Sequence, residues 1–302
     1  MVHTIWAEWK KKCMKITTSE LFYSPQGEAA LTGRPQVWVR VAKCNFECQG
    51  FNNPNKVDTT TNEGLGFDPS KYKSLKDLPV ISVGCDSIYS WDDRFKHLWS
   101  TWELEELADA LLTLTPHQSW ITPQGQKIGL TLTGGEPTSR MKAIVELIKL
   151  PQFDNLETLT FETNCSVPLK QAHMDALSEW SYYTGKQIVW SNSPKLSITG
   201  EPWEKAINPS VALMQRQVKG SYQYFKFVCE PTEESFGEVE KAMEEYWTAG
   251  IPDDTEIWVM PVGGLLEQQQ QVDRRVAEMC LERGWNVSLR AHIYVFGNEV
   301  GT

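Results

Sequence analysis

The sequence lacks several features that would place the protein in a membrane, outside the cell or on nucleic acid. None of its 302 residues belongs to an apolar run approaching the roughly 20 residues that cross a bilayer. Residues 1–9 show no apolar stretch followed by a small-residue cleavage site, so we expect no secretory signal. Lysine and arginine total 29 against 39 acidic residues, and a net charge of −10 is not typical of a general nucleic-acid binder. These absences predict a cytoplasmic protein that binds neither membrane nor nucleic acid.

We also expect no disulfide framework, because the number of cysteines is odd, at seven, and the sequence shows no export signal. They are Cys13, Cys44, Cys48, Cys85, Cys165, Cys229 and Cys280. An odd number in a chain of this length indicates reduced thiols. A single cysteine is ordinarily a small buried hydrophobe, and we expect this for Cys13, Cys229 and Cys280.

Short β-branched and aromatic runs alternate with helical patterns along the chain. We expect strands at residues 37–41, 128–132, 159–161, 188–190, 224–228, 257–260 and 291–296. Apolar residues recur at helical spacing over residues 141–148, 239–247 and 272–280. This alternation predicts right-handed βαβ units and a parallel sheet, in which the chemistry lies at the carboxyl ends of the strands.

Residues 49–84, which we call the insert, have a different composition. Asparagine, threonine, proline and glycine make this segment polar and rich in turns. This composition predicts a long surface loop or small subdomain with little helix of its own. Loops of this length are uncommon and are often functional.

Three other features are expected to be structural. The histidines His3, His97, His117 and His173 have no metal-binding spacing among themselves. The aromatic-rich stretch Trp91–Trp102 is expected to pack against the sheet. The glutamine tract Gln268–Gln271 reads as a solvated helix face.

Two cysteines follow the first expected strand in the pattern Cys44-Asn45-Phe46-Glu47-Cys48. Thiolates in one loop can converge on one metal centre, and soft sulfur ligands select iron–sulfur clusters, zinc or copper. Two cysteines do not complete a tetrahedral zinc site, and no paired histidine motif supplies the missing ligands.

The turn Gly134-Gly135-Glu136-Pro137 follows the next expected strand. Its glycines would let backbone amides approach a ligand, and Glu136 can accept a hydrogen bond from an ammonium or hydroxyl group. The same sequence could simply connect a strand to a helix. Its position one strand after the cysteine loop favours a functional role.

Together these motifs resemble those of the radical S-adenosylmethionine (SAM) enzymes. That superfamily carries C-x3-C-x2-C after its first barrel strand and a GGE-type motif after the second, and its three thiolates hold a 4Fe-4S cluster whose fourth iron binds SAM. Here Phe51 stands where the third cysteine would be. The best candidate for the third ligand is Cys85, because its segment resembles the one that follows the third cysteine in one family of this superfamily. Cys85 is separated from Cys48 by 36 residues, and such an excursion is tolerated because loop entropy grows only slowly with length. Cys165, which follows another expected strand, is a rival.

One family within this superfamily, the 7-carboxy-7-deazaguanine synthases, is resembled most closely. Gly84–Asp92 is similar to its CDT-x-Y-x-WD signature. Further similar segments follow the family's order: Ser24–Glu28, Thr32–Pro35, Arg40, Glu162–Asn164, Ser193–Lys195, Lys226–Val228, Met260–Gly263, and His292 with Gly297 and Asn298. The resemblance runs from about Ser19 to Thr302. It implies an α/β fold, a partial TIM-like barrel of the radical SAM type, with residues 1–302 as a single domain interrupted by the insert.

The resemblance also implies roles for individual residues. The cluster ligands would be Cys44, Cys48 and Cys85. SAM would be bound by Gly84, Cys85, Asp86, Gly135, Glu136, Ser193, Pro194, Lys195, Met260, Pro261, Val262 and Gly263. Magnesium would bind Ser87, which replaces the family's threonine and keeps its hard oxygen donor. Substrate would be contacted by Pro25, Gln26, Gly27, Arg40, Thr133 and the terminal residue Thr302. Arg40 suits a carboxylate because its planar fork binds one in bidentate fashion, although it could instead pair with a neighbouring acid.

The implied activity is that of a carbon–nitrogen lyase that contracts a ring. It would convert 6-carboxy-5,6,7,8-tetrahydropterin to 7-carboxy-7-deazaguanine with loss of ammonia, in 7-deazapurine (queuosine-type) biosynthesis. SAM would be regenerated as a cofactor, a flavodoxin- or ferredoxin-type protein would donate electrons, and the chain would form a homodimer.

Two alternatives remain open at this stage. A radical SAM activase that places a glycyl radical on a partner protein would share the cysteines and the GGEP turn. A non-catalytic protein could use Cys44 and Cys48 to bind zinc or no metal. The role of the insert and the destination of the product are not determined by the sequence.

Overall fold

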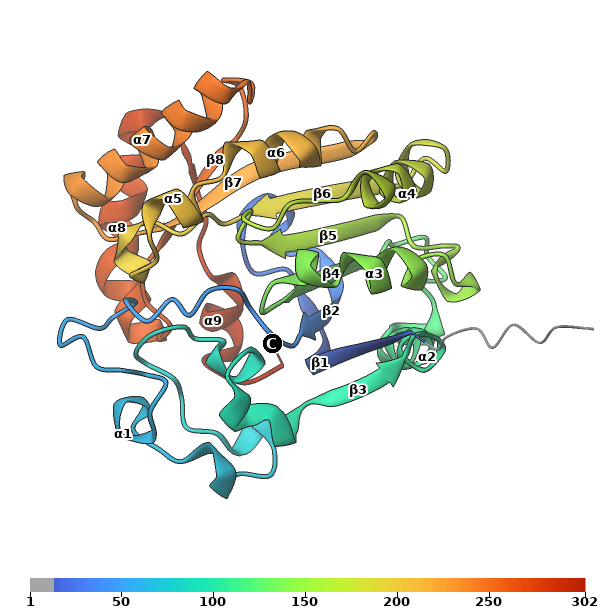
Figure 1. Cartoon of the computed structure of the whole chain (residues 1–302), viewed down its shortest axis with the longest axis horizontal. Coiled ribbons are helices and arrows are strands. Elements are labelled where there is room, and N and C mark those ends of the chain that lie inside the picture. The colour runs from blue at the N-terminus through green and yellow to red at the C-terminus, as the bar shows by residue number, and fades with distance from the viewer. Residues whose placement is uncertain (1–13, 302) are drawn as a thin grey trace, which may run out of the picture.

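A curved, open β-sheet with helices along its outer face organises residues 14–301, the part of the chain that the computed structural model describes (Figure 1). The strands are ordered β3-β1-β2-β4-β5-β6-β7-β8-β9. Their bounds are β1 Lys15–Pro25, β2 Pro35–Val41, β3 Ser100–Glu103, β4 Gly129–Gly134, β5 Thr158–Thr163, β6 Gln187–Asn192, β7 Ser221–Cys229, β8 Ile257–Pro261 and β9 Asn286–Val287. From β2 to β9 neighbouring strands are parallel, whereas β1 pairs in antiparallel fashion with β2 and β3.

The helices are α1 Asn62–Leu65, α2 Leu104–Leu114, α3 Met141–Leu147, α4 Gln171–Tyr182, α5 Trp203–Ala206, α6 Pro209–Arg216, α7 Glu233–Ala249, α8 Leu266–Arg283 and α9 Ala291–Phe296. Helices α3 to α8 connect the successive parallel strands from β4 to β9, and α9 follows β9. Short 3-10 turns include η2 Pro69–Lys71, η3 Leu75–Asp77, η4 Ile88–Ser90 and η5 Asp93–Leu98. Among the described residues, no helix is both long and apolar enough to span a membrane.

The two faces of the sheet differ in polarity, and this difference creates the site. Val37, Leu130 and Phe161 point to the outer face, where they pack against helix residues such as Leu107 and Ile144. Because side chains alternate along a strand, the intervening residues point inward. Many of these are polar or charged: Gln36, Arg40, Thr131, Thr133, Thr160, Glu162, Ser191 and Lys226. Polar side chains therefore line the inner face, up to the carboxyl ends of the strands.

Most expected elements are confirmed, and one is wrong. The strands expected from residue 37 to residue 260 correspond to β2 and β4–β8, and the three expected helices to α3, α7 and α8. The last expected strand, 291–296, is helix α9. The edge of β8 is already paired with β9, and in α9 only Ile293 is buried, while Val295 is 69% exposed. The apolar run thus lies on the surface instead of forming another strand.

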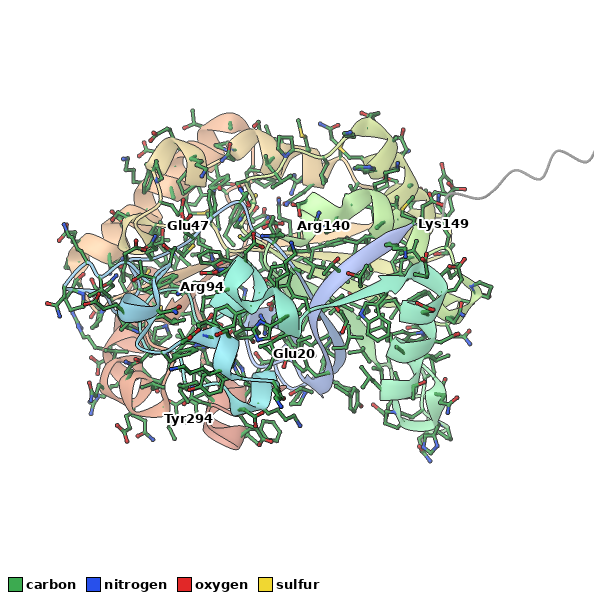
Figure 2. All side chains as sticks on the ribbon, turned by 60° about the horizontal axis from the view of Figure 1, so that its bottom comes forward. Glu20, Glu47, Arg94, Arg140, Lys149 and Tyr294 are labelled. Atoms are coloured by element: carbon green, nitrogen blue, oxygen red, sulfur yellow. The ribbon has the colours of Figure 1, made fainter. Side chains whose placement is uncertain are left out.

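The insert folds back onto the segment that follows it. Leu65, Phe67, Leu75, Leu78 and Ile81 pack against Ile88, Tyr89 and Phe95, which form a small apolar core of their own. Arg94 (labelled in Figure 2) donates to the Thr59 carbonyl and to the Asn62 side chain. The amide of Gly84 donates to the carbonyl of Phe51 at 2.7 Å. This bond joins the two ends of the insert and brings Cys85 back towards Cys48.

Candidate functional site

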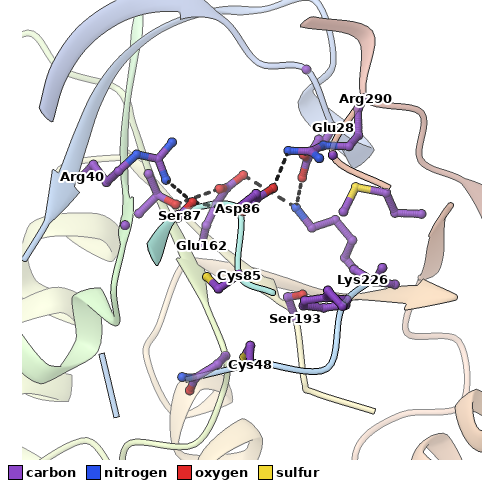
Figure 3. A pocket seen from close by; sticks show the side chains of 18 of the residues that line it. Glu28, Arg40, Cys48, Cys85, Asp86, Ser87, Glu162, Ser193, Lys226 and Arg290 are labelled. Carbon is purple, nitrogen blue, oxygen red and sulfur yellow. Dashed lines mark hydrogen bonds and ion pairs between the residues drawn. The ribbon is translucent and has the colours of Figure 1, made fainter. Parts of the chain in front are cut away.

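A cavity of about 240 Å³ opens at the carboxyl ends of the parallel strands. Its walls come from β1, β2, β4, β5, β7 and β8, from the insert, and from the segment that enters α9. Figure 3 shows thiols towards one end of the cavity and a network of ion pairs towards the other. We call these the thiol half and the ionic half.

Most of the side chains predicted to bind ligands line this cavity together. They are Pro25, Gln26, Gly27, Arg40, Cys44, Cys48, Gly84, Cys85, Asp86, Ser87, Thr133, Gly135, Ser193, Lys195, Met260, Pro261 and Gly263. Glu136, Pro194 and Val262 are not among the residues that line it. Thr302 lies outside the described residues.

The thiol half contains Cys44, Cys48 and Cys85. All three contact one apolar cluster that includes Phe46 and Ala206. Burial, together with the neighbouring Glu136 carboxyl, raises the pKa of Cys44 to about 12. Burial also raises the pKa values of Cys48 and Cys85. Burial thus disfavours the thiolate form of all three side chains.

The rival thiol, Cys165, lies elsewhere. It is fully buried in the core between β7 and α7, where its sulfur is 3.9 Å from Oε1 of Gln215. It does not line the cavity. Cys85 therefore lines the same cavity as Cys44 and Cys48, whereas Cys165 does not.

Three thiols with apolar neighbours are a donor set that an iron–sulfur cluster can use. Among the described residues, no group of three or more histidine, cysteine or acidic side chains is arranged to hold one metal ion. An iron–sulfur cluster is held by cysteine thiolates, and solvent exposure is one of the factors that set its reduction potential. The three thiols at this cavity supply such ligands, and Phe46 and Phe51 lie beside them.

The GGEP turn holds the cysteine loop in place. The amides of Gly135 and Glu136 donate to the carbonyls of Val41 and Lys43 at 3.0 and 2.9 Å. A Cβ on Gly135 would collide with the Lys43 carbonyl, so only glycine allows this approach. These two amides are already used within the protein, which differs from the expected approach to a ligand.

Glu136 is likewise occupied. Its buried carboxylate accepts hydrogen bonds from Thr138, Thr163 and the amide of Asn164, at 2.6 to 3.0 Å. Burial raises its pKa, and these bonds offset part of that effect. Glu136 thus joins β4 to the end of β5 and is not among the residues that line the cavity.

The ionic half is built around Glu28. Its carboxylate pairs with Lys226 from β7 and with Nε of Arg290 at 3.2 Å. Burial alone would raise the pKa of Glu28, but Lys226 and Arg290 outweigh it and hold the pKa well below its usual range. Lys226 also lies 3.8 Å from Glu162, whose other partners are Gln26 and Thr133. Each charge in this half has an opposite partner.

Arg40 and Ser87 connect the ionic half to the segment that carries Cys85 (Figure 3). Nη1 of Arg40 donates to Oγ of Ser87 at 3.0 Å, and that hydroxyl donates to Asp86 at 3.1 Å. Arg40 also pairs with Glu20 at 3.1 Å. The guanidinium thus has an acidic neighbour and also lines the cavity, and its contact with a substrate carboxylate stays a prediction. Ser87 and Asp86 offer hard oxygen atoms of the type that magnesium prefers.

Several cavity residues were not assigned a role from the sequence. Four of them lie within the motifs, so the motifs could have indicated them: Glu28, Glu162, Lys226 and His292. Arg290 had no such signal. Its guanidinium reaches Glu28, Asp86 at 2.9 Å and the Gly263 carbonyl at 3.2 Å. It therefore joins three segments that the motifs indicated separately, namely Ser24–Glu28, Gly84–Asp92 and Met260–Gly263.

The glutamine tract also contributes to the site, contrary to expectation. Gln269 is fully buried and donates to the carbonyls of Pro261 and Gly263 at 3.0 and 2.6 Å. Gln268 accepts from the amides of Gly264 and Leu265. The first turn of α8 thereby fixes the Met260–Gly263 turn, in which Gly263 has a φ of +127°.

Comparison with known proteins gives consistent matches. No protein-family profile matches the chain. The 7-carboxy-7-deazaguanine synthase of Pyrobaculum aerophilum is 25% identical over 287 residues, covering 95% of this chain and 97% of that protein. The enzyme of the same name from Clostridium acetobutylicum is 23% identical over 260 residues, covering 86% and 87%.

A solved structure agrees in fold. The crystal structure of QueE from Escherichia coli matches with a TM-score of 0.52 and 19% identity, over 92% of this chain and 95% of that chain. The expected α/β fold with an unclosed barrel is thus confirmed. The resemblance predicted from the ordered motifs is confirmed as well: over nearly its whole length, this chain is similar to the 7-carboxy-7-deazaguanine synthases.

Proposed function

We propose that this chain is a radical SAM 7-carboxy-7-deazaguanine synthase, a lyase that converts 6-carboxy-5,6,7,8-tetrahydropterin to 7-carboxy-7-deazaguanine and ammonia. The observation that carries the proposal is the composition of the cavity: three thiols lie in one half and paired charges in the other. The first half suits a cluster and SAM, and the second suits a polar, carboxylated heterocycle.

Cys44, Cys48 and Cys85 would hold a 4Fe-4S cluster. Ser193, Lys195, Met260, Pro261 and Gly263 line the same cavity and would bind SAM. When bound, the cluster and SAM supply the radical chemistry, and the protein supplies position and an environment that excludes water. The apolar neighbours Phe46 and Phe51 limit solvent around the thiols.

The ionic half would bind the pterin. Arg40 is the proposed partner of the substrate carboxylate, because its guanidinium reaches into the cavity from β2. Glu28 and Glu162 present carboxylate oxygens that can accept from ring N–H groups. Gln26 and Thr133 hydrogen-bond Glu162 and so orient it. Pro25 and Gly27 would form the adjoining wall, where a side chain on Gly27 would collide with His292.

Magnesium would bind Ser87, with Asp86 beside it. The donors are suitable, but Arg40 donates to the same hydroxyl. For a cation to bind there, the Ser87 oxygen must give up the hydrogen bond from Arg40, and the Ser87 O–H must stop donating to Asp86. Arg40 would then turn to the substrate carboxylate. We further propose an external flavodoxin- or ferredoxin-type electron donor, a homodimer and a cytoplasmic location.

The test is turnover by protein reconstituted anaerobically with iron and sulfide. With SAM, a reductant and magnesium, we expect the carboxylated deazaguanine and ammonia in equal amounts by mass spectrometry and ammonia assay. Protein with about four irons per chain that leaves the pterin unchanged would contradict the proposed reaction and favour the activase. Colourless, metal-free protein after reconstitution would favour the non-catalytic alternative.

A further inference from the structure

The segment 198–205 packs closely against the loop that carries Cys48. The amide of Gly50 donates to the Thr199 carbonyl at 2.9 Å, and a Cβ on Gly50 would collide with the Ile198 carbonyl. Nζ of Lys205 donates to the Asn45 carbonyl at 3.3 Å. This segment follows the Ser193–Lys195 turn directly, so it connects the proposed SAM site with the proposed cluster loop.

One carboxylate within that segment engages the loop backbone. Oε1 of Glu201 accepts hydrogen bonds from the amide of Glu47 (labelled in Figure 2) at 2.7 Å and from the amide of Cys48 at 3.0 Å. The Glu201 side chain is only 10% exposed. Hydrogen bonds to an ionised acceptor are stronger than neutral ones. These two bonds therefore hold the loop backbone at Glu47 and Cys48.

The loop needs such support because its backbone is strained. Cys48 has a φ of +49°, a left-handed conformation that non-glycine residues rarely adopt. Backbone of this kind persists only when surrounding contacts fix it. Glu201 supplies that fixation at the strained residue itself, since it binds the amide of Cys48.

We propose that Glu201 is a positioning residue for the Cys48 loop and that it lowers the reduction potential of the cluster bound there. The inference rests on the proposed cluster ligands. Cluster potentials depend on nearby charge and on N–H donors to sulfur. Glu201 adds negative charge and directs two loop amides towards itself, and both effects favour the oxidised cluster. Lys205, 3.9 Å from Glu201 and half exposed, offsets this only in part.

The first test uses cluster-free protein, so it does not depend on the proposed function. Hydrogen exchange of the peptide 44–50 is compared in wild type, Glu201→Ala, Glu201→Gln and Glu204→Gln. Glu204 lies three residues away and is exposed, and it serves as the matched charge control. We expect exchange about tenfold faster in Glu201→Ala, an intermediate rate in Glu201→Gln, and no change in Glu204→Gln. Equal exchange in Glu201→Ala and Glu204→Gln would overturn the positioning role.

The second test measures the midpoint potential of the reconstituted cluster by a redox titration followed by electron paramagnetic resonance. We expect a higher potential in Glu201→Gln than in wild type, and an unchanged potential in Glu204→Gln. Equal potentials in the two variants would overturn the electrostatic role. Wild-type protein that forms no cluster would instead contradict the proposed function, and the exchange test would still decide whether Glu201 holds the loop.

Discussion

The two halves of the cavity are stabilised in opposite ways. In the ionic half, Glu28, Lys226 and Arg290 compensate one another, and the pKa of Glu28 is held low despite burial. In the thiol half, burial raises the pKa values of the three cysteines, and apolar side chains surround them. Removing a charge from the first half should therefore cost folding free energy, whereas removing a thiol from the second should cost cofactor binding.

The largest expected effect separates two cysteines. Cys85→Ala should lose the cluster, because it removes one of three thiols at the cavity. Cys165→Ala should keep it, because Cys165 is buried in another core. Iron and sulfide content and visible absorbance after anaerobic reconstitution measure this difference. We expect the free energy of unfolding of cluster-free Cys85→Ala to change by no more than about 1 kcal/mol. Retention of about four irons by Cys85→Ala would refute the assignment.

A substitution in the ionic half should act on folding instead. Lys226→Met removes the buried ammonium and leaves Glu28 and Glu162 less compensated, which should lower the free energy of unfolding by about 3–5 kcal/mol. The control Lys127→Met breaks a half-exposed surface pair with Glu157, and its cost should stay below about 1 kcal/mol. Guanidinium denaturation of cluster-free protein measures both. Similar costs for the two variants would show that the ionic half is not a closed network.

The pH dependence of stability should identify the same network. The folded pKa of Glu28 lies below its unfolded value, so its contribution is present above about pH 4.3 and is lost as the pH falls towards the folded pKa. The groups that face it are Lys226, Arg290, His292 and Asp86. Glu28→Gln should be less stable than wild type near neutral pH, and this difference should shrink in acid. A difference that is constant between pH 6 and pH 3 would contradict this electrostatic origin.

The sequence predicted the thiol half better than the ionic half, for a physical reason. Cys44, Gly135 and Ser193 follow parallel strands, and the ends of parallel strands meet at one edge of the sheet. Cys85 could be placed only by resemblance, because the return of the insert depends on a tertiary hydrogen bond between Gly84 and Phe51. Arg290 had no local signal at all.

Spacing also cannot tell whether a polar group faces a ligand or the protein. The amide of Gly135 and the carboxylate of Glu136 were expected to face a ligand, but both bind other parts of the chain. Gln269 was expected on a solvated face, but it supports the Met260–Gly263 turn from inside. In each case the partner is distant in sequence or set by a turn whose geometry the sequence does not specify.

The smallest expected effect lies at Ser87, where the two halves meet. Ser87→Ala removes the hydroxyl that accepts from Arg40 and donates to Asp86, while Arg40 keeps Glu20 and Asp86 keeps Arg290. The free energy of unfolding should therefore fall by only about 1 kcal/mol. If Ser87 also binds magnesium, the magnesium concentration that gives half-maximal turnover should rise several-fold in Ser87→Ala. It should not rise in Ser87→Thr, which keeps the oxygen donor. Ser70→Ala, which breaks a similar serine–aspartate pair in the insert, should leave that concentration unchanged. Equal magnesium requirements in Ser87→Ala and wild type would limit Ser87 to the hydrogen-bond network of the ionic half.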